Sequence, residues 1–251
     1  MKKGFISALL LCTLSFYAQA QTKKPVSKAA PKPPVTKTVT GAVSPPWKQL
    51  PTKERLVEIV TDYGTMVAKL YDSTPLHRNN FVKLVQQGFY DSLLFHRVIE
   101  GFMIQGGDPT SKHAADGSPL GSGSAPGNRV PAEFKQNLFH KKGALAAARD
   151  NNPEKASSNC QFYIVQGKKL TEQELEGQMG RVRQSNAAFK YSPGQKEIYT
   201  RLGGTPGLDQ GYTVFGEVIS GLDVIDQIAA VQKNAGDRPV KNVMMKMRML
   251  N

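Results

Sequence analysis

The sequence predicts a mainly β domain in which short strands are framed by two helices and interrupted by a helical insertion. Short apolar runs bounded by turn residues recur from about residue 55 to the C-terminus, which is the pattern of short strands. Two helical patterns begin near Thr74 and Gly221, and two further helix-start signals lie between residues 168 and 204. A chain of 251 residues can hold one large domain or two small ones, and we assign a single domain to residues 51–251.

A secretory signal peptide is predicted at residues 1–20. Two lysines precede a short apolar run over residues 5–17, and Ala18-Gln19-Ala20 supplies small residues before a cleavage site. The run is too short for a comfortable membrane span. We therefore expect cleavage, export to the periplasm or another extracytoplasmic space, and no stable membrane insertion afterwards. A retained membrane anchor is the alternative.

The formal charge of +13 is concentrated before the predicted domain. Eight lysines and no acidic residue precede Pro51, which leaves +5 for the remainder. Residues 21–50 are rich in Lys, Pro, Thr, Ser and Ala, so they cannot bury enough apolar surface to fold and are expected to form a disordered linker. Because the domain shows no basic motif interleaved with aromatic residues, nucleic acid is not an expected partner.

The cysteines and histidines point to neither a disulfide nor a metal. Cys12 lies in the signal peptide, so the mature chain keeps only Cys160 and forms no intramolecular disulfide. We interpret Cys160 as a small buried residue rather than a redox thiol. The four histidines lack metal-ligand spacing, and the Gly/Ser loop at 117–127 lacks the Gly-Lys-Ser/Thr of a phosphate-binding loop. No metal or cofactor is expected.

The domain is predicted to open with a hairpin and a helix. Residues 56–60 and 66–71 read as strands around the turn Asp62-Tyr63-Gly64. Thr74 then acts as the N-cap of a helix, with Pro75 in its first turn and Gly88 at its end. Near the C-terminus a short helix follows Gly221, and residues 245–249 alternate methionine with basic residues as a last strand.

Residues 95–108 carry the most informative pattern. They read Phe-His-Arg-Val-Ile, Glu, Gly-Phe-Met-Ile and Gln-Gly-Gly-Asp. If residues 95–99 form a strand, Phe95, Arg97 and Ile99 share one face, which places an arginine among apolar side chains. Such a cation must be satisfied. An ion pair with a core carboxylate and a functional role are both compatible with the pattern.

This segment resembles the signature of the cyclophilin peptidyl-prolyl isomerases. Residues 143–149, 161–165 and 208–218 are similar to cyclophilin strands and occur in the family's order, so the resemblance covers about residues 55–250. It implies a closed antiparallel eight-stranded barrel capped by two helices, with residues 168–204 as an added helical insertion. It also implies an enzyme that isomerises X-Pro bonds in unfolded or extended polypeptides, here as a monomer that assists the folding of exported proteins.

The chemistry of X-Pro isomerisation needs neither a nucleophile nor a metal. The C–N bond has partial double-bond character, and rotation about it meets a barrier of ~20 kcal/mol. A catalyst must favour the twisted amide, whose nitrogen carries a localised lone pair. That task calls for a fixed hydrogen-bond donor beside an apolar seat for the proline ring, and Arg97 offers a rigid donor fork that stays charged.

The resemblance assigns roles to particular positions. It implies that Arg97 binds the proline carbonyl and approaches the proline nitrogen, and that Gln105 orients Arg97 and contacts substrate. Arg97 is the only charge that we place inside the proline-binding cluster. The substrate-binding residues that the resemblance implies are His96, Phe102, Met103, Ala148, Arg149, Gln161, Tyr163, Leu208 and Tyr212. The backbone around Ala148 and Arg149 matches the segment that pairs with the extended peptide.

Several positions depart from the family pattern. Tyr163 stands where Phe is common, so we expect a more polar pocket wall, and Gly207 takes the place of a tryptophan. The insertion at 168–204 carries two capping boxes and is expected to form two helices beside the substrate groove. It is either a determinant of substrate choice or a solvent-exposed addition without a role.

A binding module that holds proline-containing segments with little turnover is the competing function. For a hydrolase no serine elbow with a partnered histidine is evident, since His77 is placed on a helix face and His96 is expected to bond backbone.

Overall fold

The structure is a computed structural model that describes residues 55–250. The predicted signal peptide and linker lie outside the described residues. The elements in chain order are β1 (Arg55–Thr61), β2 (Gly64–Leu70), α1 (Pro75–Gln86), β3 (Leu93–Ile99), β4 (Met103–Gly106), β5 (Ala144–Ala147), β6 (Phe162–Val165), α2 (Glu172–Ser185), α3 (Pro193–Arg201), β7 (Val214–Ser220), α4 (Leu222–Ala229) and β8 (Met244–Met249).

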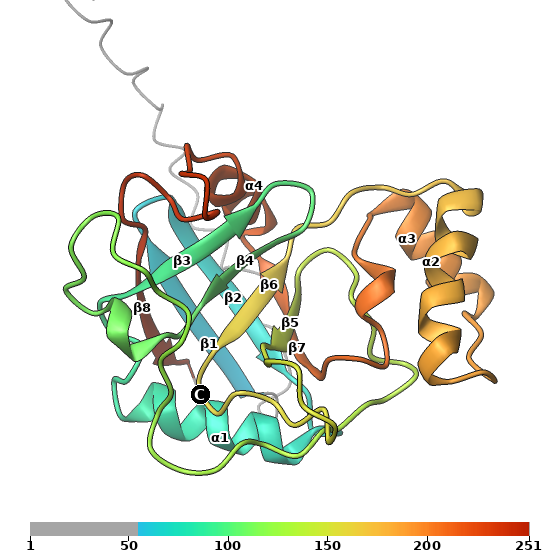
Figure 1. Ribbon diagram of the computed structural model, residues 1–251, viewed down its shortest axis with the longest axis horizontal. Coiled ribbons are helices and arrows are strands. Elements are labelled where there is room, and N and C mark those ends of the chain that lie inside the picture. The colour runs from blue at the N-terminus through green and yellow to red at the C-terminus, as the bar shows by residue number, and fades with distance from the viewer. Residues whose placement is uncertain (1–54, 251) are drawn as a thin grey trace, which may run out of the picture. The chain divides into compact units, whose positions relative to one another are not determined.

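The eight strands close into an antiparallel barrel, as the resemblance implies. Their order around the barrel is β1-β2-β7-β5-β6-β4-β3-β8. Inward side chains such as Ile59, Leu145 and Ile164 are fully buried and form the core. The helices α1 and α4 lie at opposite ends of the barrel (Figure 1), and Phe81 of α1 and Ile225 of α4 join the same core. The two framing helices are therefore confirmed.

A β-bulge in β3 overturns the expected alternation of its side chains. The β3–β4 pairing shifts register between Phe95 and Arg97, which leaves His96 as the extra residue. Phe95 and Val98 consequently point into the barrel core, whereas Ile99 packs with Met103 on the outer side. The expectation that Phe95, Arg97 and Ile99 share one face is wrong. Arg97 is not enclosed by apolar side chains either, since its side chain is 43% exposed.

The start of α1 is capped by a residue distant in sequence. Thr74 stands at the N-cap position, but its side chain makes no capping bond. The carboxylate of Glu133 instead accepts hydrogen bonds from the backbone N–H groups of Leu76 (3.1 Å) and His77 (3.0 Å). A carboxylate at this end of a helix also interacts favourably with the helix dipole. The predicted N-cap position of Thr74 is therefore confirmed, but the acceptor that caps the helix is Glu133.

The insertion forms two helices that stand to one side of the barrel (Figure 1). Both predicted capping boxes are present, with Thr171 and Glu174 at the start of α2 and Ser192 and Gln195 at the start of α3. The two helices share a small apolar core of their own. Its buried members are Leu170, Leu175, Met179, Val182, Phe189, Tyr191 and Tyr199.

A tight neck joins the insertion to the barrel. A Cβ atom at Gly167 would overlap the backbone of Gly204, and one at Gly203 would lie 2.7 Å from the backbone of Lys168. The N–H of Gly204 also donates to the carbonyl of Lys168 at 3.1 Å. The segments that enter and leave the insertion therefore pack with their backbones in direct contact. Only glycine permits so close an approach at these positions.

Candidate active site

A small cavity of about 100 Å³ opens on the outer wall of the barrel, and we call it the central cavity. Nine of the eleven predicted site residues line it, namely Arg97, Phe102, Met103, Gln105, Ala148, Arg149, Tyr163, Leu208 and Tyr212. The other two predicted residues lie beside it. His96 lines an adjoining cavity of about 610 Å³, and Gln161 lines a second of about 520 Å³.

Apolar and aromatic side chains form much of the wall of the central cavity. Met103 of β4 and Tyr163 of β6 are both buried, and the ring of Tyr212 stands at 81° to that of Tyr163 with centroids 6.0 Å apart. Phe102 reaches the cavity because the chain reverses after β3 at Gly101, which adopts a positive φ of 73°. The cavity thus offers a preformed apolar seat for a small ring.

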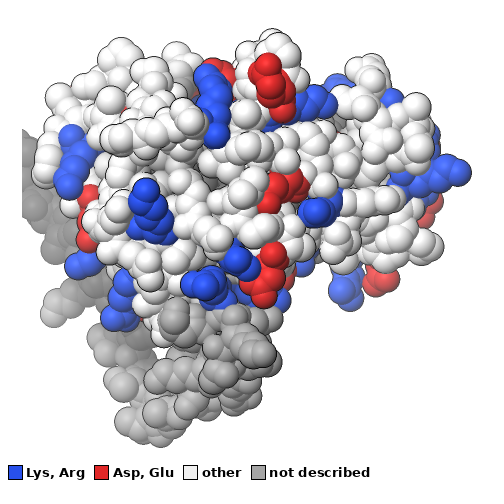
Figure 2. All heavy atoms as spheres, turned by 90° about the horizontal axis from the view of Figure 1, so that it is seen from below, with Lys and Arg blue, Asp and Glu red and all other residues white. Residues whose placement is uncertain are grey.

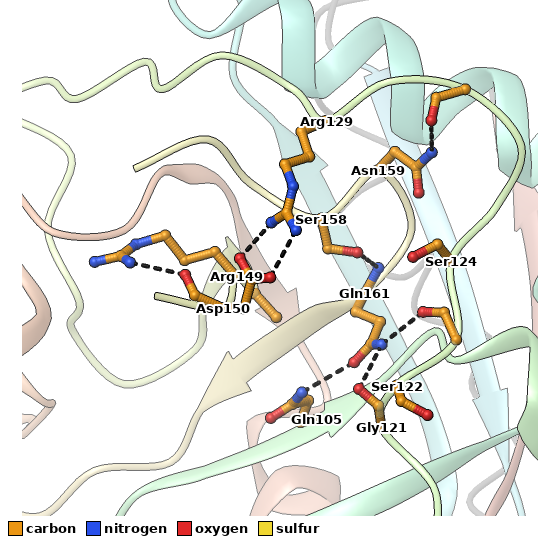
Figure 3. A pocket seen from close by; sticks show the side chains of 13 residues that line it. Gln105, Gly121, Ser122, Ser124, Arg129, Arg149, Asp150, Ser158, Asn159 and Gln161 are labelled. Carbon is orange, nitrogen blue, oxygen red and sulfur yellow. Dashed lines mark hydrogen bonds and ion pairs between the residues drawn. The ribbon is translucent and has the colours of Figure 1, made fainter. Parts of the chain in front are cut away.

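Arg97 stands at the rim of the cavity, directly across from Gln105 in the β3–β4 pairing. Its Nε lies 3.6 Å from Asp237 Oδ2, a loose ion pair that leaves most of the guanidinium donors available. Gln105 Nε2 donates to Gln161 Oε1 at 3.2 Å, and Gln161 Nε2 donates to the carbonyl of Gly121 at 2.9 Å (Figure 3). Among the described residues no hydrogen bond joins Gln105 to Arg97, so the orienting role of Gln105 stays a prediction.

A second arginine, Arg149, also lines the cavity. Arg149 Nε donates to the carbonyl of Gly211 at 2.9 Å, and its Cζ lies 4.6 Å from the ring centre of Tyr212. The guanidinium of Arg149 is therefore held by a hydrogen bond and a cation–π contact. The expectation that Arg97 is the only charge in the cluster is wrong, because the side chain of Arg149 is a second one. The resemblance implied a role only for the backbone at this position.

The backbone beside the cavity is partly committed to the protein itself. The N–H of Ala148 donates to the carbonyl of Gln161 (3.0 Å), and its carbonyl accepts from the N–H of Ser158 (2.8 Å). In the described part of the chain, the N–H and carbonyl of Arg149 have no such partner. Of the two residues expected to pair with an extended peptide, only Arg149 keeps its backbone groups available.

His96 is buried without a hydrogen-bond partner. Its side chain is 4% exposed, and neither ring nitrogen has a partner among the described residues. The ring lies beside Gly121, where an added Cβ would lie 3.5 Å from Nε2, and the backbone group that contributes to its electrostatic environment is that of Leu94. Burial lowers the pKa of His96 to about 4, so the ring is neutral at pH 7.

The hydroxyl of Tyr163 faces a buried network rather than the cavity. Tyr163 Oη lies 2.9 Å from His140 Nε2, and His140 Nδ1 lies 2.6 Å from Asp209 Oδ1. The other carboxylate oxygen, Asp209 Oδ2, accepts hydrogen bonds from the hydroxyls of Tyr191 (2.7 Å) and Tyr199 (2.6 Å). The expected rise in wall polarity is wrong, and Asp209 links the insertion to the wall of the cavity.

His77 lies on a face of α1, as predicted, and this face is the buried one. Its Nδ1 lies 2.7 Å from Glu133 and its Nε2 lies 2.9 Å from the hydroxyl of Ser157. This order of serine, histidine and acid resembles a hydrolase triad, but Ser157 is only 1% exposed and does not line the central cavity. The group fastens α1 to the neighbouring loops instead.

Cys160 is buried, and burial raises the pKa of its thiol. It accepts a hydrogen bond from the N–H of Ala125 at 3.2 Å. This environment keeps the sulfur protonated and unreactive at neutral pH, as a small core residue would be. Within residues 55–250, no three His, Cys, Asp or Glu side chains form a group that could hold a metal ion.

One face of the described residues carries charges of both signs. In Figure 2, Lys and Arg side chains lie interspersed with Asp and Glu among uncharged residues. The helices between residues 55 and 250 are all too short or too polar to cross a membrane.

Comparison with known proteins identifies the family. Residues 56–248 match the family described as cyclophilin type peptidyl-prolyl cis-trans isomerase/CLD. The chain belongs to the cyclophilin-type peptidyl-prolyl cis-trans isomerases. Isomerase activity follows from that membership.

Individual relatives agree with this assignment. A peptidyl-prolyl cis-trans isomerase of Staphylococcus epidermidis is 36% identical over 199 residues, which are 79% of this chain and 92% of the relative. A bifunctional phosphatase/peptidyl-prolyl cis-trans isomerase of Streptococcus pyogenes is 36% identical over 192 residues, but this chain spans only 37% of its length. A cyclophilin-type isomerase of Cryptosporidium parvum shares the fold, with a TM-score of 0.57 and 21% identity over 79% of this chain and 98% of its own.

Proposed function

We propose that this protein isomerises X-Pro bonds in exported polypeptides that are unfolded or extended, and that Arg97 stabilises the twisted amide. The observation that carries the proposal is the central cavity, in which buried apolar walls meet a half-exposed guanidinium. A proline ring seated against Met103 and Phe102 would bring its amide to the rim where Arg97 stands. A Cryptosporidium parvum cyclophilin has been solved in the presence of the dipeptide Ala-Pro, which supports a proline-containing substrate.

The proposed mechanism is electrostatic and involves no covalent step. As the amide twists, its nitrogen loses conjugation and becomes a better hydrogen-bond acceptor. Donors of Arg97 therefore bind the twisted amide more strongly than the planar one, which lowers the barrier. The apolar walls hold the ring while the residue before proline rotates. The nearby Arg149 is already bound to Gly211 and Tyr212, so we assign it to shaping the cavity.

Arg97→Ala tests the mechanism. We expect catalytic efficiency on a proline tetrapeptide to fall about 10²–10³-fold, which corresponds to ~3–4 kcal/mol for a lost preorganised donor. Arg97→Lys should also be poor, because an ammonium cannot reproduce the guanidinium fork. Folding should persist because Asp237, which loses its partner, is itself partly exposed. The measurement is a protease-coupled isomerase assay alongside circular dichroism.

Arg201→Ala is the matched control, because Arg201 is an exposed arginine on α3 outside the cavity. Its activity should equal that of the wild type. Near-wild-type turnover by a folded Arg97→Ala protein would remove the mechanism. Absence of turnover in the wild type itself, with peptide binding retained, would indicate the binding module instead.

Export is proposed from the N-terminal pattern alone. The mature protein should begin at Gln21, after Ala18-Gln19-Ala20, and act as a monomer outside the cytoplasm. Intact mass spectrometry of the exported protein tests this. A full-length product retained in the membrane would refute cleavage.

A further inference from the structure

A further cavity lies between the insertion and the barrel, next to the central cavity. Its volume is about 350 Å³, and we call it the insertion groove. The residues that matter for its chemistry are Phe102, Lys168, Gln178, Arg181, Thr205 and Leu208. Phe102 and Leu208 also line the central cavity, so the two cavities adjoin. Because an extended chain advances about 3.3 Å per residue, a residue two or three positions from a bound proline would reach the groove.

The groove is lined by two cations and no acid. Lys168 Nζ is engaged by Glu174 at 3.1 Å in an exposed pair. Arg181, in contrast, has no ion pair or hydrogen bond among the described residues and is exposed. An arginine fork without an internal partner is well suited to bind a carboxylate with two parallel hydrogen bonds.

Neutral donors near Arg181 are also uncommitted. The Oγ1 atom of Thr205 is buried and has no hydrogen-bond partner within the described part of the chain. The amide of Gln178 lies over Gly207, where an added Cβ would come within 2.5 Å of its Oε1. The side chain of Gln178 therefore occupies the space beside Gly207 and brings a further polar group to the groove.

Two glycines of α2 near Arg181 in the sequence face open space. Gly177 and Gly180 lie within this helix, and a Cβ atom at either would meet nothing within 4 Å. Packing therefore does not require these glycines, although each lowers helix stability by about 1 kcal/mol relative to alanine. Gly177 lies one turn before Arg181 on the same side of the helix, so that approach to the guanidinium is not obstructed.

We propose that the insertion groove is a substrate subsite that binds an acidic side chain, Asp or Glu, two or three residues from the isomerised proline. The inference rests on the proposed function, since it requires the proline to occupy the central cavity. It assigns the insertion a role in substrate choice, with Arg181 as the residue that determines the preference.

The test uses ten-residue peptides with one proline and either Glu or Gln at each position from three before to three after it. Isomerisation rates are measured by NMR exchange spectroscopy. We expect the wild type to prefer Glu over Gln at one position by roughly three- to tenfold, in KM rather than kcat, as for a partly exposed ion pair. The preference should shrink at high salt.

Arg181→Ala should reduce the preference to about one while the rate on the Gln peptide changes less than twofold. Arg201→Ala, on the neighbouring helix and outside the groove, should keep the preference. A wild type without preference at any position, or a preference that survives Arg181→Ala, overturns the subsite. Failure of the proposed function is distinguishable, because the wild type would then not accelerate isomerisation of the Gln peptides either.

Discussion

The substitution Tyr163→Phe separates the role of the Tyr163 ring from the role of its hydroxyl. The ring lines the central cavity, whereas the hydroxyl contacts His140 at 2.9 Å. Asp209 Oδ1 accepts both the backbone N–H of His140 (2.8 Å) and its Nδ1 (2.6 Å), so Nδ1 carries a proton. The remaining ring nitrogen, Nε2, has the hydroxyl of Tyr163 as its hydrogen-bond partner. The substitution removes this hydroxyl and leaves the aromatic ring of residue 163 in place.

The expected loss follows from the burial of His140. The histidine is fully buried, so no water replaces the missing hydroxyl, and an unsatisfied buried polar group costs about 1–3 kcal/mol. A domain of this size shifts its melting temperature by about 2–4 °C per kcal/mol, so a loss of 2 kcal/mol would lower it by about 4–8 °C. Catalytic efficiency on a tetrapeptide should stay within about twofold, because the wall of the cavity is retained.

Tyr199→Phe is the matched variant, since its hydroxyl binds Asp209 in the same network but away from the central cavity. Thermal unfolding and isomerase rates are measured for both single variants and the double variant. We expect non-additive stability losses, because both hydroxyls act through one carboxylate. An unchanged melting temperature together with a tenfold loss of activity in Tyr163→Phe would refute the reasoning, because the hydroxyl would then serve the cavity.

Three further outcomes are expected. Gly180→Ala should stabilise the protein by about 0.5–1 kcal/mol in thermal melts, because the new methyl group enters open space on α2. The unfolded state takes up a proton at His96 near pH 6.5, but the folded state does so only near pH 4. The free energy of unfolding should therefore fall by up to about 3 kcal/mol as the pH is lowered from 6.5 to 4. Chemical denaturation of His96→Gln should show a smaller fall over the same range. Replacing residues 168–204 with a short Gly/Ser loop should reduce activity on unfolded proteins more than on tetrapeptides, and equal loss on both would indicate a structural role.

Local patterns predicted the elements well wherever the deciding contacts are local. Both capping boxes of the insertion join residues three apart, and both form. The N-cap position of α1 was also predicted, but the acceptor at that cap, Glu133, lies 57 residues from Leu76 and was missed. No local pattern reveals such a partner.

The candidate site was predicted as a set of positions but not as a set of contacts. Nine residues matched by resemblance meet in one cavity. The bulge at His96 is invisible in a strand that reads as regular alternation, so the burial of that ring and the exposure of Arg97 were both missed. The network around Asp209 was missed because Tyr191 and Tyr199 belong to the insertion and meet Asp209 only in three dimensions.

Closure of the barrel prevents the enzyme from pairing edge to edge with its proposed unfolded substrates. An open sheet would present unpaired N–H and C=O groups to which an extended, unfolded chain could add as a further strand. Here every strand has a neighbour on both sides. Beyond the short β3–β8 pairing, residues 237–243 cover the outer edge of β3, with the N–H of Phe95 bound to Val243 (2.9 Å) and that of Val98 to Asp237 (2.8 Å). An unfolded substrate therefore cannot add to the barrel as a further strand, and it can dissociate after its X-Pro bond has isomerised.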